Sequence, residues 1–334
     1  MSGALVPYHQ RQNKAVDRHL FIDLLVRLNR RLPIVDYTYV SFGGAFLEDF
    51  KLLHGAFGNR KLISLENDQI AWRRQQFNVP LSCISCLHQD SADFVAQYAI
   101  EGNAIVWLDY ASAGETRRQF NEFQALLPKL RRYDIVKITF NANPNSLRDS
   151  RSADENGKRE TAEVRNKKRF EVLDKRIGDF IPQEFNFESM TVDGYPRVLS
   201  KALEVAASEA LKGQSNMLFQ PLTSFTYNDL AHQMLTISGI LLERSERVAF
   251  IRDCALRAFR LATLRWGDYK KIMLPALTAR ERLFIDQHLP RSRERTIQRK
   301  LKFWFDPDED VSLEILKSYI EFYRQYPNFH RVLF

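Results

Sequence analysis

The sequence predicts an α/β protein built on a doubly wound, mostly parallel sheet. Over residues 35–145, short segments rich in β-branched and aromatic residues alternate with segments of helical spacing. One of them, 104–108 (AIVWL), is a continuous apolar run, as expected of a strand buried on both faces. Residues 219–227 and 234–242 can form a late antiparallel pair, although the same stretch can also be read as a helix interrupted by Gly239. Alternating strands and helices of these lengths describe a doubly wound sheet.

The elements are expected in the following order. Residues 14–31 carry apolar side chains three and four positions apart, which predicts a helix that Pro33 ends. Strands are predicted at 37–42, 61–65, 82–87, 104–108 and 134–140, with helices at 46–54, from the second strand to Phe77, at about 115–130 and at 195–212. The remainder is expected to be mostly helical: Thr278 and Glu281 form a capping box that begins a helix reaching about His288, and 312–323 is a last amphipathic helix.

This order divides the chain into three parts: an N-terminal helical cover (1–34), an α/β domain (35–242) and a helical C-terminal region (243–334). The domain carries a charged insertion at 145–180, in which residues 145–176 hold ten Lys and Arg and seven Asp and Glu. Charge runs are usually solvated, so a loop followed by an exposed helix is the favoured interpretation. The alternative is a mobile lid over a site at the strand ends.

Composition excludes several classes of protein. The 334 residues are 45% hydrophobic and 27% charged, which is typical of a globular protein. Three cysteines exclude a disulfide scaffold, and no apolar run approaches the roughly 20 residues that span a bilayer. The first residues lack the apolar core of a signal peptide, so a cytoplasmic protein is expected. The net charge of +8 permits an anionic partner without requiring one.

In an open parallel sheet, ligands bind at the carboxyl ends of the strands. Gly43 and Gly44 follow the first predicted strand, and Glu66 follows the second, 22 residues after Gly44. Glycines let the main chain turn tightly beside a ligand, and an acid at the end of the next strand can accept two hydrogen bonds from a ribose diol. The pattern therefore favours a nucleoside-containing ligand, although GGAF lacks the complete G-x-G-x-x-G spacing.

The segments YVSFGGAFLEDF, LISLEND, CLHQDSADF and AIVWLDY resemble, in this order, the first four motifs of class I S-adenosylmethionine-dependent methyltransferases. The resemblance covers about residues 35–145, and it implies a late antiparallel hairpin that completes the sheet. It implies S-adenosylmethionine as the cofactor and Asp109 and Tyr110 as the residues that face the methyl group and the substrate. The cofactor-binding residues that it implies are Phe42, Gly43, Gly44, Glu66, Asn67, Gln89, Asp90 and Ser91.

The sequence departs from the family pattern in ways that bear on the reaction. Ser41 stands where an acid often precedes the glycine loop, and a third glycine is missing. The fourth motif reads Leu-Asp-Tyr-Ala, without the Asn/Asp-Pro-Pro-aromatic pattern of enzymes that methylate amino groups of bases. This argues against methylation of base nitrogens and leaves transfer to oxygen or to another acceptor open. Asp109 could remove a proton from a hydroxyl or orient it. The alternatives are that Asp109 and Asp90 only cap the helices that follow them, and that Glu66 is a solvated turn acid.

Polar residues also precede the first helix. Arg11, Asn13 and Lys14 could reach a carboxylate or phosphate of a ligand if this helix covers the cofactor cleft, but an exposed polar N-terminus is the favoured interpretation. Residues 291–302 hold six basic residues and one acid before Phe303-Trp304-Phe305, so nucleic acid is a conceivable but not a favoured partner.

No metal site is expected. Cys83 and Cys86 form a lone CxxC within a predicted strand, where an odd spacing directs the sulfurs to opposite faces. Residues 306–310 (DPDED) lack the central glycine and the distal glutamate of a calcium loop, and the histidines are scattered.

The leading hypothesis is a methyltransferase that uses S-adenosylmethionine, with an oxygen atom of an unidentified molecule as acceptor. A second hypothesis, from another class, is a non-catalytic module of this fold that binds a nucleotide-like ligand, a protein or nucleic acid, for instance in a defence or regulatory assembly. A nicotinamide-dependent oxidoreductase is disfavoured by the incomplete glycine pattern. The sequence leaves the oligomeric state open.

Overall fold

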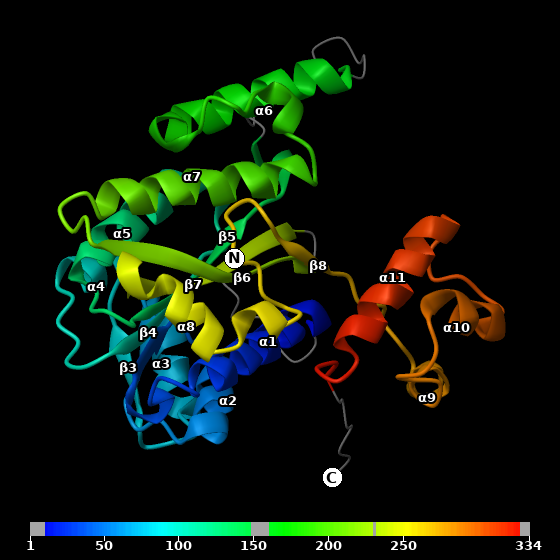
Figure 1. Ribbon diagram of the computed structural model, residues 1–334, viewed down its shortest axis with the longest axis horizontal. Coiled ribbons are helices and arrows are strands. Elements are labelled where there is room, and N and C mark those ends of the chain that lie inside the picture. The colour runs from blue at the N-terminus through cyan, green and yellow to red at the C-terminus, as the bar shows by residue number, and fades with distance from the viewer. Residues whose placement is uncertain (1–10, 148–159, 230–231, 328–334) are drawn as a thin grey trace.

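The computed structural model describes residues 11–147, 160–229 and 232–327. Its centre is an eight-stranded sheet of order β3-β2-β1-β4-β5-β7-β6-β8 (Figure 1). β7 is antiparallel to both of its neighbours, while the remaining strand pairs are parallel. The strands are β1 Thr38–Ser41, β2 Leu62–Glu66, β3 Ile84–His88, β4 Ala104–Asp109, β5 Ile135–Asn141, β6 Met217–Asp229, β7 His232–Glu243 and β8 Lys270–Ile272.

The prediction of a doubly wound sheet with a late antiparallel hairpin is thereby confirmed, and the helical alternative for the hairpin region is wrong. The short strand β8 was not expected, because three residues of ordinary composition between loops give no periodic signal. It pairs with β6 through Phe225 to Tyr227 and extends the sheet beyond the hairpin.

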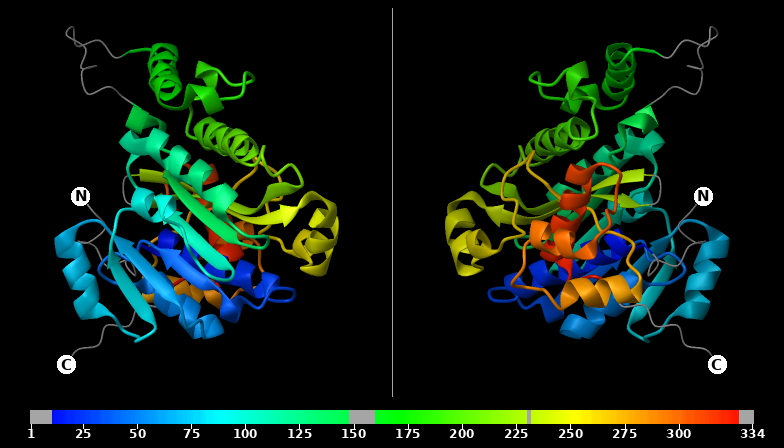
Figure 2. Two further views of the ribbon diagram at one scale, coloured as in Figure 1. Left: turned by 90° about the vertical axis from the view of Figure 1, so that its left-hand side faces the viewer. Right: turned by 90° about the vertical axis from the view of Figure 1, so that its right-hand side faces the viewer.

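Helices cover both faces of the sheet (Figure 2). One buried cluster joins α1, α2, α8 and the C-terminal helices to one face, and a second joins α4, α5, α6 and α7 to the other. The helices are α1 Gln12–Leu28, α2 Glu48–Phe57, α3 Gln69–Asn78, α4 Ser91–Ala96, α5 Thr116–Leu126, α6 Ala162–Ile177, α7 Gly194–Ala210, α8 Arg247–Asp253, α9 Ala279–Asp286, α10 Glu294–Leu301 and α11 Glu309–Phe322. The capping box of Thr278 and Glu281 does begin α9, as predicted.

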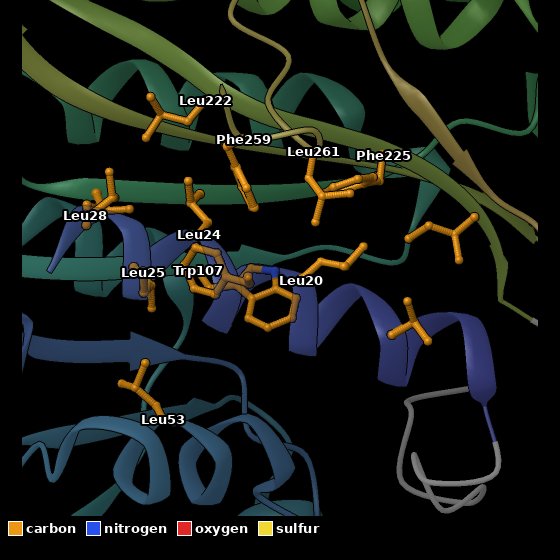
Figure 3. Close-up of a cluster of buried hydrophobic side chains, with 14 of the residues drawn as sticks. Leu20, Leu24, Leu25, Leu28, Leu53, Trp107, Leu222, Phe225, Phe259 and Leu261 are labelled. Atoms are coloured by element: carbon orange, nitrogen blue, oxygen red, sulfur yellow. The ribbon is translucent and has the colours of Figure 1, made fainter. Parts of the chain in front are cut away.

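The predicted apolar stripe of α1 packs against the sheet (Figure 3). Leu20, Leu24 and Leu28 are completely buried, and Trp107 of β4 lies among them. Burying each leucine stabilises the fold by about 1.5–3 kcal/mol relative to an exposed side chain. Because this packing seats α1 on the sheet, the polar residues at its first turn are held at a defined place.

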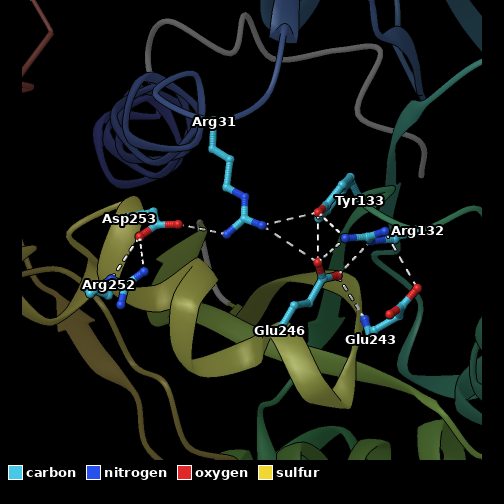
Figure 4. Close-up of polar contacts among 7 residues, drawn as sticks. All are labelled: Arg31, Arg132, Tyr133, Glu243, Glu246, Arg252 and Asp253. Atoms are coloured by element: carbon cyan, nitrogen blue, oxygen red, sulfur yellow. Dashed lines mark hydrogen bonds and ion pairs between the residues drawn. The ribbon is translucent and has the colours of Figure 1, made fainter.

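Ion pairs attach the residues that follow α1 to the end of the sheet at which the parallel strands begin (Figure 4). The guanidinium of Arg31 contacts Asp253 at 3.0 Å and Glu246 at 3.8 Å. Glu246 also pairs with Arg132 and accepts a hydrogen bond of 2.7 Å from the hydroxyl of Tyr133. The chain after α1, the turn before β5 and the start of α8 are thus joined, well away from the carboxyl ends of the parallel strands.

The described part of the charged insertion includes α6, which buries Leu173 and Ile177 and leaves most of its other side chains exposed or half-buried. This agrees with the exposed-helix interpretation; residues 148–159 of the insertion and residues 1–10 of the N-terminal cover lie outside the described residues. Within the described ranges, no group of three or more potential metal ligands is found. Nor does any helix in those ranges have the length and apolar character needed to cross a membrane.

Candidate active site

A cavity of about 660 Å³ lies at the carboxyl ends of β1 to β4. Its volume falls within the range of about 300–1,000 Å³ typical of small-molecule sites. The strand ends contribute Phe42, Leu65, Glu66, Asn67, Gln89, Asp90, Ser91, Asp109 and Tyr110 to its wall. Residues that are far apart in the sequence meet here because parallel strands end at the same edge of the sheet.

The glycine loop lies beside this wall, next to Phe42, but neither glycine lines the cavity. A Cβ atom on Gly43 would lie 2.3 Å from Leu47 Cδ2 and 2.4 Å from Ser64 Oγ, so the missing side chain makes room for the protein itself. The Gly43 amide donates to Ser64 Oγ at 3.0 Å, and Gly44 has a φ of +52°. The two glycines therefore permit the tight turn that places Phe42 in the cavity wall.

Replacing Gly43 with alanine is expected to lower the free energy of unfolding by about 1–3 kcal/mol, because the contacting groups are buried and short of space. Gly55→Ala is the matched control, since its Cβ would meet no atom within 4 Å and it lies inside α2. Alanine favours a helix interior by about 0.5–1 kcal/mol relative to glycine, so this variant should be slightly stabilised. Urea unfolding measures both; equal stability of the two variants would contradict the packing argument.

Glu66 ends β2 with its carboxylate partly buried at the cavity. Glu66 Oε1 accepts a hydrogen bond of 3.1 Å from the Asp68 amide. Burial raises the pKa of this carboxyl from its ordinary value, against the lowering effect of that hydrogen bond. The adjacent Asn67 directs its amide toward Asp90 Oδ2 at 3.4 Å, which links the ends of β2 and β3.

Asp90 both caps a helix and lines the cavity. Asp90 Oδ1 accepts a hydrogen bond of 2.8 Å from the Ala92 amide at the start of α4, and it also pairs with Arg118 of α5. Partial burial alone would raise the pKa of Asp90, but the hydrogen bonds from Arg118 and Ala92 outweigh it and lower the pKa. The capping interpretation and the cavity interpretation thus describe the same side chain.

Asp109 ends β4 and is held by the first helix. Lys14 Nζ lies 2.9 Å from Asp109 Oδ2 and 3.9 Å from Asp229 Oδ2, and Arg11 pairs with Asp229 at 3.1 Å. Burial would raise the pKa of Asp109, but the positive charges of Lys14 and Arg18 outweigh it, so the pKa lies below its ordinary value. Asp109 is therefore an ionised carboxylate at neutral pH, with about 10% of its side chain exposed.

The three N-terminal residues singled out as anion contacts hold groups of the protein in this structure. Arg11 and Lys14 bind the two carboxylates just described. The Asn13 amide nitrogen donates to the Asn228 carbonyl at 3.0 Å, and its oxygen accepts from the Leu274 amide at 3.1 Å. They attach α1 to the end of β6 and to the segment after β8, and their side chains are buried or half-buried rather than exposed.

Tyr110 contributes its ring to the cavity wall. Its hydroxyl donates to the buried carboxylate of Glu122 on α5, and its ring meets that of Phe42 edge-on, with centroids 5.6 Å apart. Burial, together with the charge of Glu122, raises the pKa of the phenol well above 10. The side chain is thus a neutral phenol whose hydroxyl proton is hydrogen-bonded to Glu122.

Sequence reasoning did not single out several other residues of the cavity: Ser112, Glu115, Arg118, Gln119, Ser146 and His232. Arg118 and Gln119 come from the first turn of α5, which follows β4 and so reaches the same edge. His232 begins β7, and since β7 is antiparallel, its first residue lies where the parallel strands end. The register of β7 against β5 places His232 there, and the sequence analysis did not predict this register.

Residues 6–334 match the model of a family described as "Putative O-methyltransferase". The chain belongs to this O-methyltransferase family. Membership confirms the resemblance to S-adenosylmethionine-dependent methyltransferases, and the late antiparallel hairpin that the resemblance implied is present. The nicotinamide-dependent oxidoreductase hypothesis has no such support.

Solved structures match the O-methyltransferase chain at low identity. One is a "putative O-methyltransferase" from Klebsiella pneumoniae, with 12% identity, a TM-score of 0.39 and coverage of 72% of this chain and 84% of that chain. Another is the plantazolicin methyltransferase BpumL in complex with S-adenosylhomocysteine, with 10% identity, a TM-score of 0.39 and coverage of 70% and 87%. A comparison with curated proteins gives no match.

Proposed function

We propose that this member of the O-methyltransferase family is an active enzyme, that it binds S-adenosylmethionine in the cavity at the carboxyl ends of β1 to β4, and that it transfers the methyl group to an oxygen atom. The observation that carries the proposal is that Glu66 from β2 and Asp109 from β4 line one cavity of about 660 Å³. An acid after the second strand suits a ribose diol. An acid after the fourth strand lies where the resemblance to methyltransferases implies the acceptor.

The donor set fits this cofactor. S-adenosylmethionine offers a ribose diol, a flat base and a cationic sulfonium that carries the activated methyl group. Glu66 supplies carboxylate acceptors for the diol, while Phe42 and Leu65 supply an apolar wall. Asp90 and Gln89 add polar groups that can meet the edge of the base. The glycine turn places Phe42 in the cavity wall, and the glycines themselves do not line the cavity.

Asp109 acts by orienting the acceptor, in this proposal. A carboxylate whose pKa is lowered by Lys14 is a poor proton acceptor, since general-base catalysis is most effective when the pKa lies near the working pH. An ionised carboxylate in a fixed position is, however, a strong hydrogen-bond acceptor for a hydroxyl. Tyr110 then serves as a wall for the ligand, because its hydroxyl is bound to Glu122.

The arrangement of the insertion bears on the alternative of a non-catalytic module. Such a module would fill its cavity with the insertion at 145–180. Of the described residues of that segment, Ser146 lines the cavity and α6 packs instead against α5 and the turn Phe187–Ser189. Among the described residues, α6 thus leaves the cavity open to a ligand.

The test is calorimetric titration of the full chain with S-adenosylmethionine and S-adenosylhomocysteine. Glu66→Ala is expected to weaken binding of both at least about tenfold, because it removes charge-assisted hydrogen bonds worth about 1.5–3 kcal/mol each. Glu101→Ala is the matched control, since Glu101 is an exposed acid in the turn before β4 and should leave affinity unchanged. A folded wild-type chain that binds neither compound would refute the proposed cofactor.

A further inference from the structure

A second cavity, of about 470 Å³, lies at the opposite end of the sheet from the proposed cofactor site. It is bounded by α7, by the first residues of β6, by the residues that begin α8, and by the segment 264–266. β6 begins and the antiparallel β7 ends at this edge, whereas the parallel strands β1 to β5 end at the other. α7 and α8 lie on either side of the sheet here (Figure 1).

Positive charge gathers in this cavity without acids to balance it. Its wall includes Arg244, Arg247, Arg265 and Lys201, while its one acid, Glu204, is already paired with Lys201 at 2.7 Å. Within residues 11–147, 160–229 and 232–327, no carboxylate forms an ion pair with any of the three arginines. The three arginines therefore leave net positive charge at this cavity, and guanidinium groups suit the recognition of phosphate oxygens.

Two of these arginines are held in position from behind. Arg247 Nε donates to Gln220 Oε1, and Gln220 is itself buried, with its amide nitrogen bound to the carbonyls of Pro221 at 2.6 Å and Leu264 at 3.0 Å. Arg244 Nε donates to the Ser215 carbonyl at 2.9 Å. Each guanidinium is held through Nε, and no hydrogen bond joins its two terminal nitrogens to the part of the chain that the structure describes, so they can contact a ligand. This geometry suits the forked, bidentate recognition of phosphate.

The remaining wall is aromatic. Trp266 is half-buried at the cavity, and its ring lies against that of Phe219, with centroids 5.9 Å apart. An indole face beside fixed guanidinium groups offers stacking for a planar ring and charge for a phosphate in one place. An inorganic anion would use only the positive charge and not the stacking surface.

We infer that this cavity is a nucleotide-phosphate site, in which Arg244, Arg247 and Arg265 hold the phosphate groups and Trp266 packs against the base. The ligand is a free nucleotide or the phosphorylated end of a nucleic-acid strand, which share this chemistry. The site is separate from the proposed methyl-transfer cavity and does not depend on the proposed activity.

The test measures binding of a nucleoside diphosphate and of pyrophosphate to the full chain, by calorimetry and by quenching of tryptophan fluorescence. The chain is first saturated with S-adenosylhomocysteine and the titration is repeated with Glu66→Ala, so that binding at the cofactor cavity is recognised. We expect the nucleotide to bind more tightly than pyrophosphate. Its affinity should fall as the salt concentration rises. Arg244→Ala and Arg247→Ala should each weaken nucleotide binding at least about tenfold. Trp266→Leu should remove the preference for nucleotide over pyrophosphate.

Arg252→Ala is the control for charge, because Arg252 lies on the same helix as Arg247 with about 76% of its side chain exposed and its charge paired with Asp253. Thermal unfolding establishes that each variant is folded. Tighter binding of a 5′-phosphorylated oligonucleotide than of the free nucleotide would assign the ligand to a strand end, and the reverse order to a small molecule. Absence of nucleotide binding, or equal losses in Arg247→Ala and Arg252→Ala, would overturn the inference.

Discussion

Lys137→Met is expected to lower the free energy of unfolding by about 3–5 kcal/mol, because it leaves a buried carboxylate without its ion-pair partner. Lys137 lies in the middle of β5, and Lys137 Nζ contacts Asp17 Oδ2 of α1 at 2.8 Å. Both side chains are about 1% exposed. The ammonium also lies over the ring of Trp107, 3.8 Å from its centroid, so almost no water reaches the pair.

The two pKa values show what this burial costs. Burial lowers the pKa of Lys137 and raises that of Asp17, in each case against the attraction of the partner. Desolvation therefore outweighs the ion pair, and the pair is expected to contribute little net stability compared with apolar side chains of the same size. Removing one partner alone is nonetheless severe, since the other remains buried.

Urea unfolding of three variants separates these effects. Lys137→Met should be strongly destabilised, whereas the double variant Lys137→Met with Asp17→Leu should recover to wild-type stability or exceed it by about 1–4 kcal/mol. Lys51→Met is the surface control, because Lys51 pairs with Glu48 at 2.7 Å with 41% of its side chain exposed. Its loss should cost no more than about 1 kcal/mol. If Lys137→Met and Lys51→Met have the same stability, loss of Lys137 does not leave a costly unpaired carboxylate at Asp17.

Local patterns predicted most of the sheet and few of its polar contacts. β4 is apolar from residue 104 to 108, and this signal needs only neighbouring residues. The pair formed by Lys137 and Asp17 joins positions 120 residues apart, so no local pattern contains it. A lysine inside DIVKITF was nonetheless a usable sign, because a charge in a doubly buried strand requires a partner.

The same distinction applies to the candidate site. Glu66, Asp90 and Asp109 could be placed at one edge because each lies within three residues of the end of a predicted strand, and they do line one cavity. What surrounds them depends on how distant elements pack: Lys14 reaches Asp109 because α1 lies on the sheet. His232 reaches the cavity because of the hairpin register. Spacing along the chain therefore predicted which residues gather, but not which partners set their charge.

Asp109→Asn is expected to reduce kcat about 100-fold, the scale on which misplacement of a reacting group acts, while the affinity for S-adenosylhomocysteine changes little. Asparagine keeps the shape of the side chain but loses the charge that orients a hydroxyl in our proposal. The measurement is release of S-adenosylhomocysteine with a hydroxylated acceptor that the wild type turns over. Tyr110→Phe is the control, because it removes only a hydroxyl that is bound to Glu122. Equal kcat values for Asp109→Asn and wild type would exclude Asp109 from the reaction.

A structural readout accompanies the kinetic one. The pKa of Asp109 is lowered in the folded chain, so its ion pair with Lys14 stabilises the fold fully above the unfolded value of about 3.9. This contribution is lost as the pH falls through that value toward the lower folded one. In Asp109→Asn the free energy of unfolding should accordingly be lower at neutral pH and should fall less steeply below about pH 4. An unchanged acid limb would mean that Lys14 does not hold Asp109 in solution, and the orientation of the acceptor by a fixed carboxylate would lose its basis.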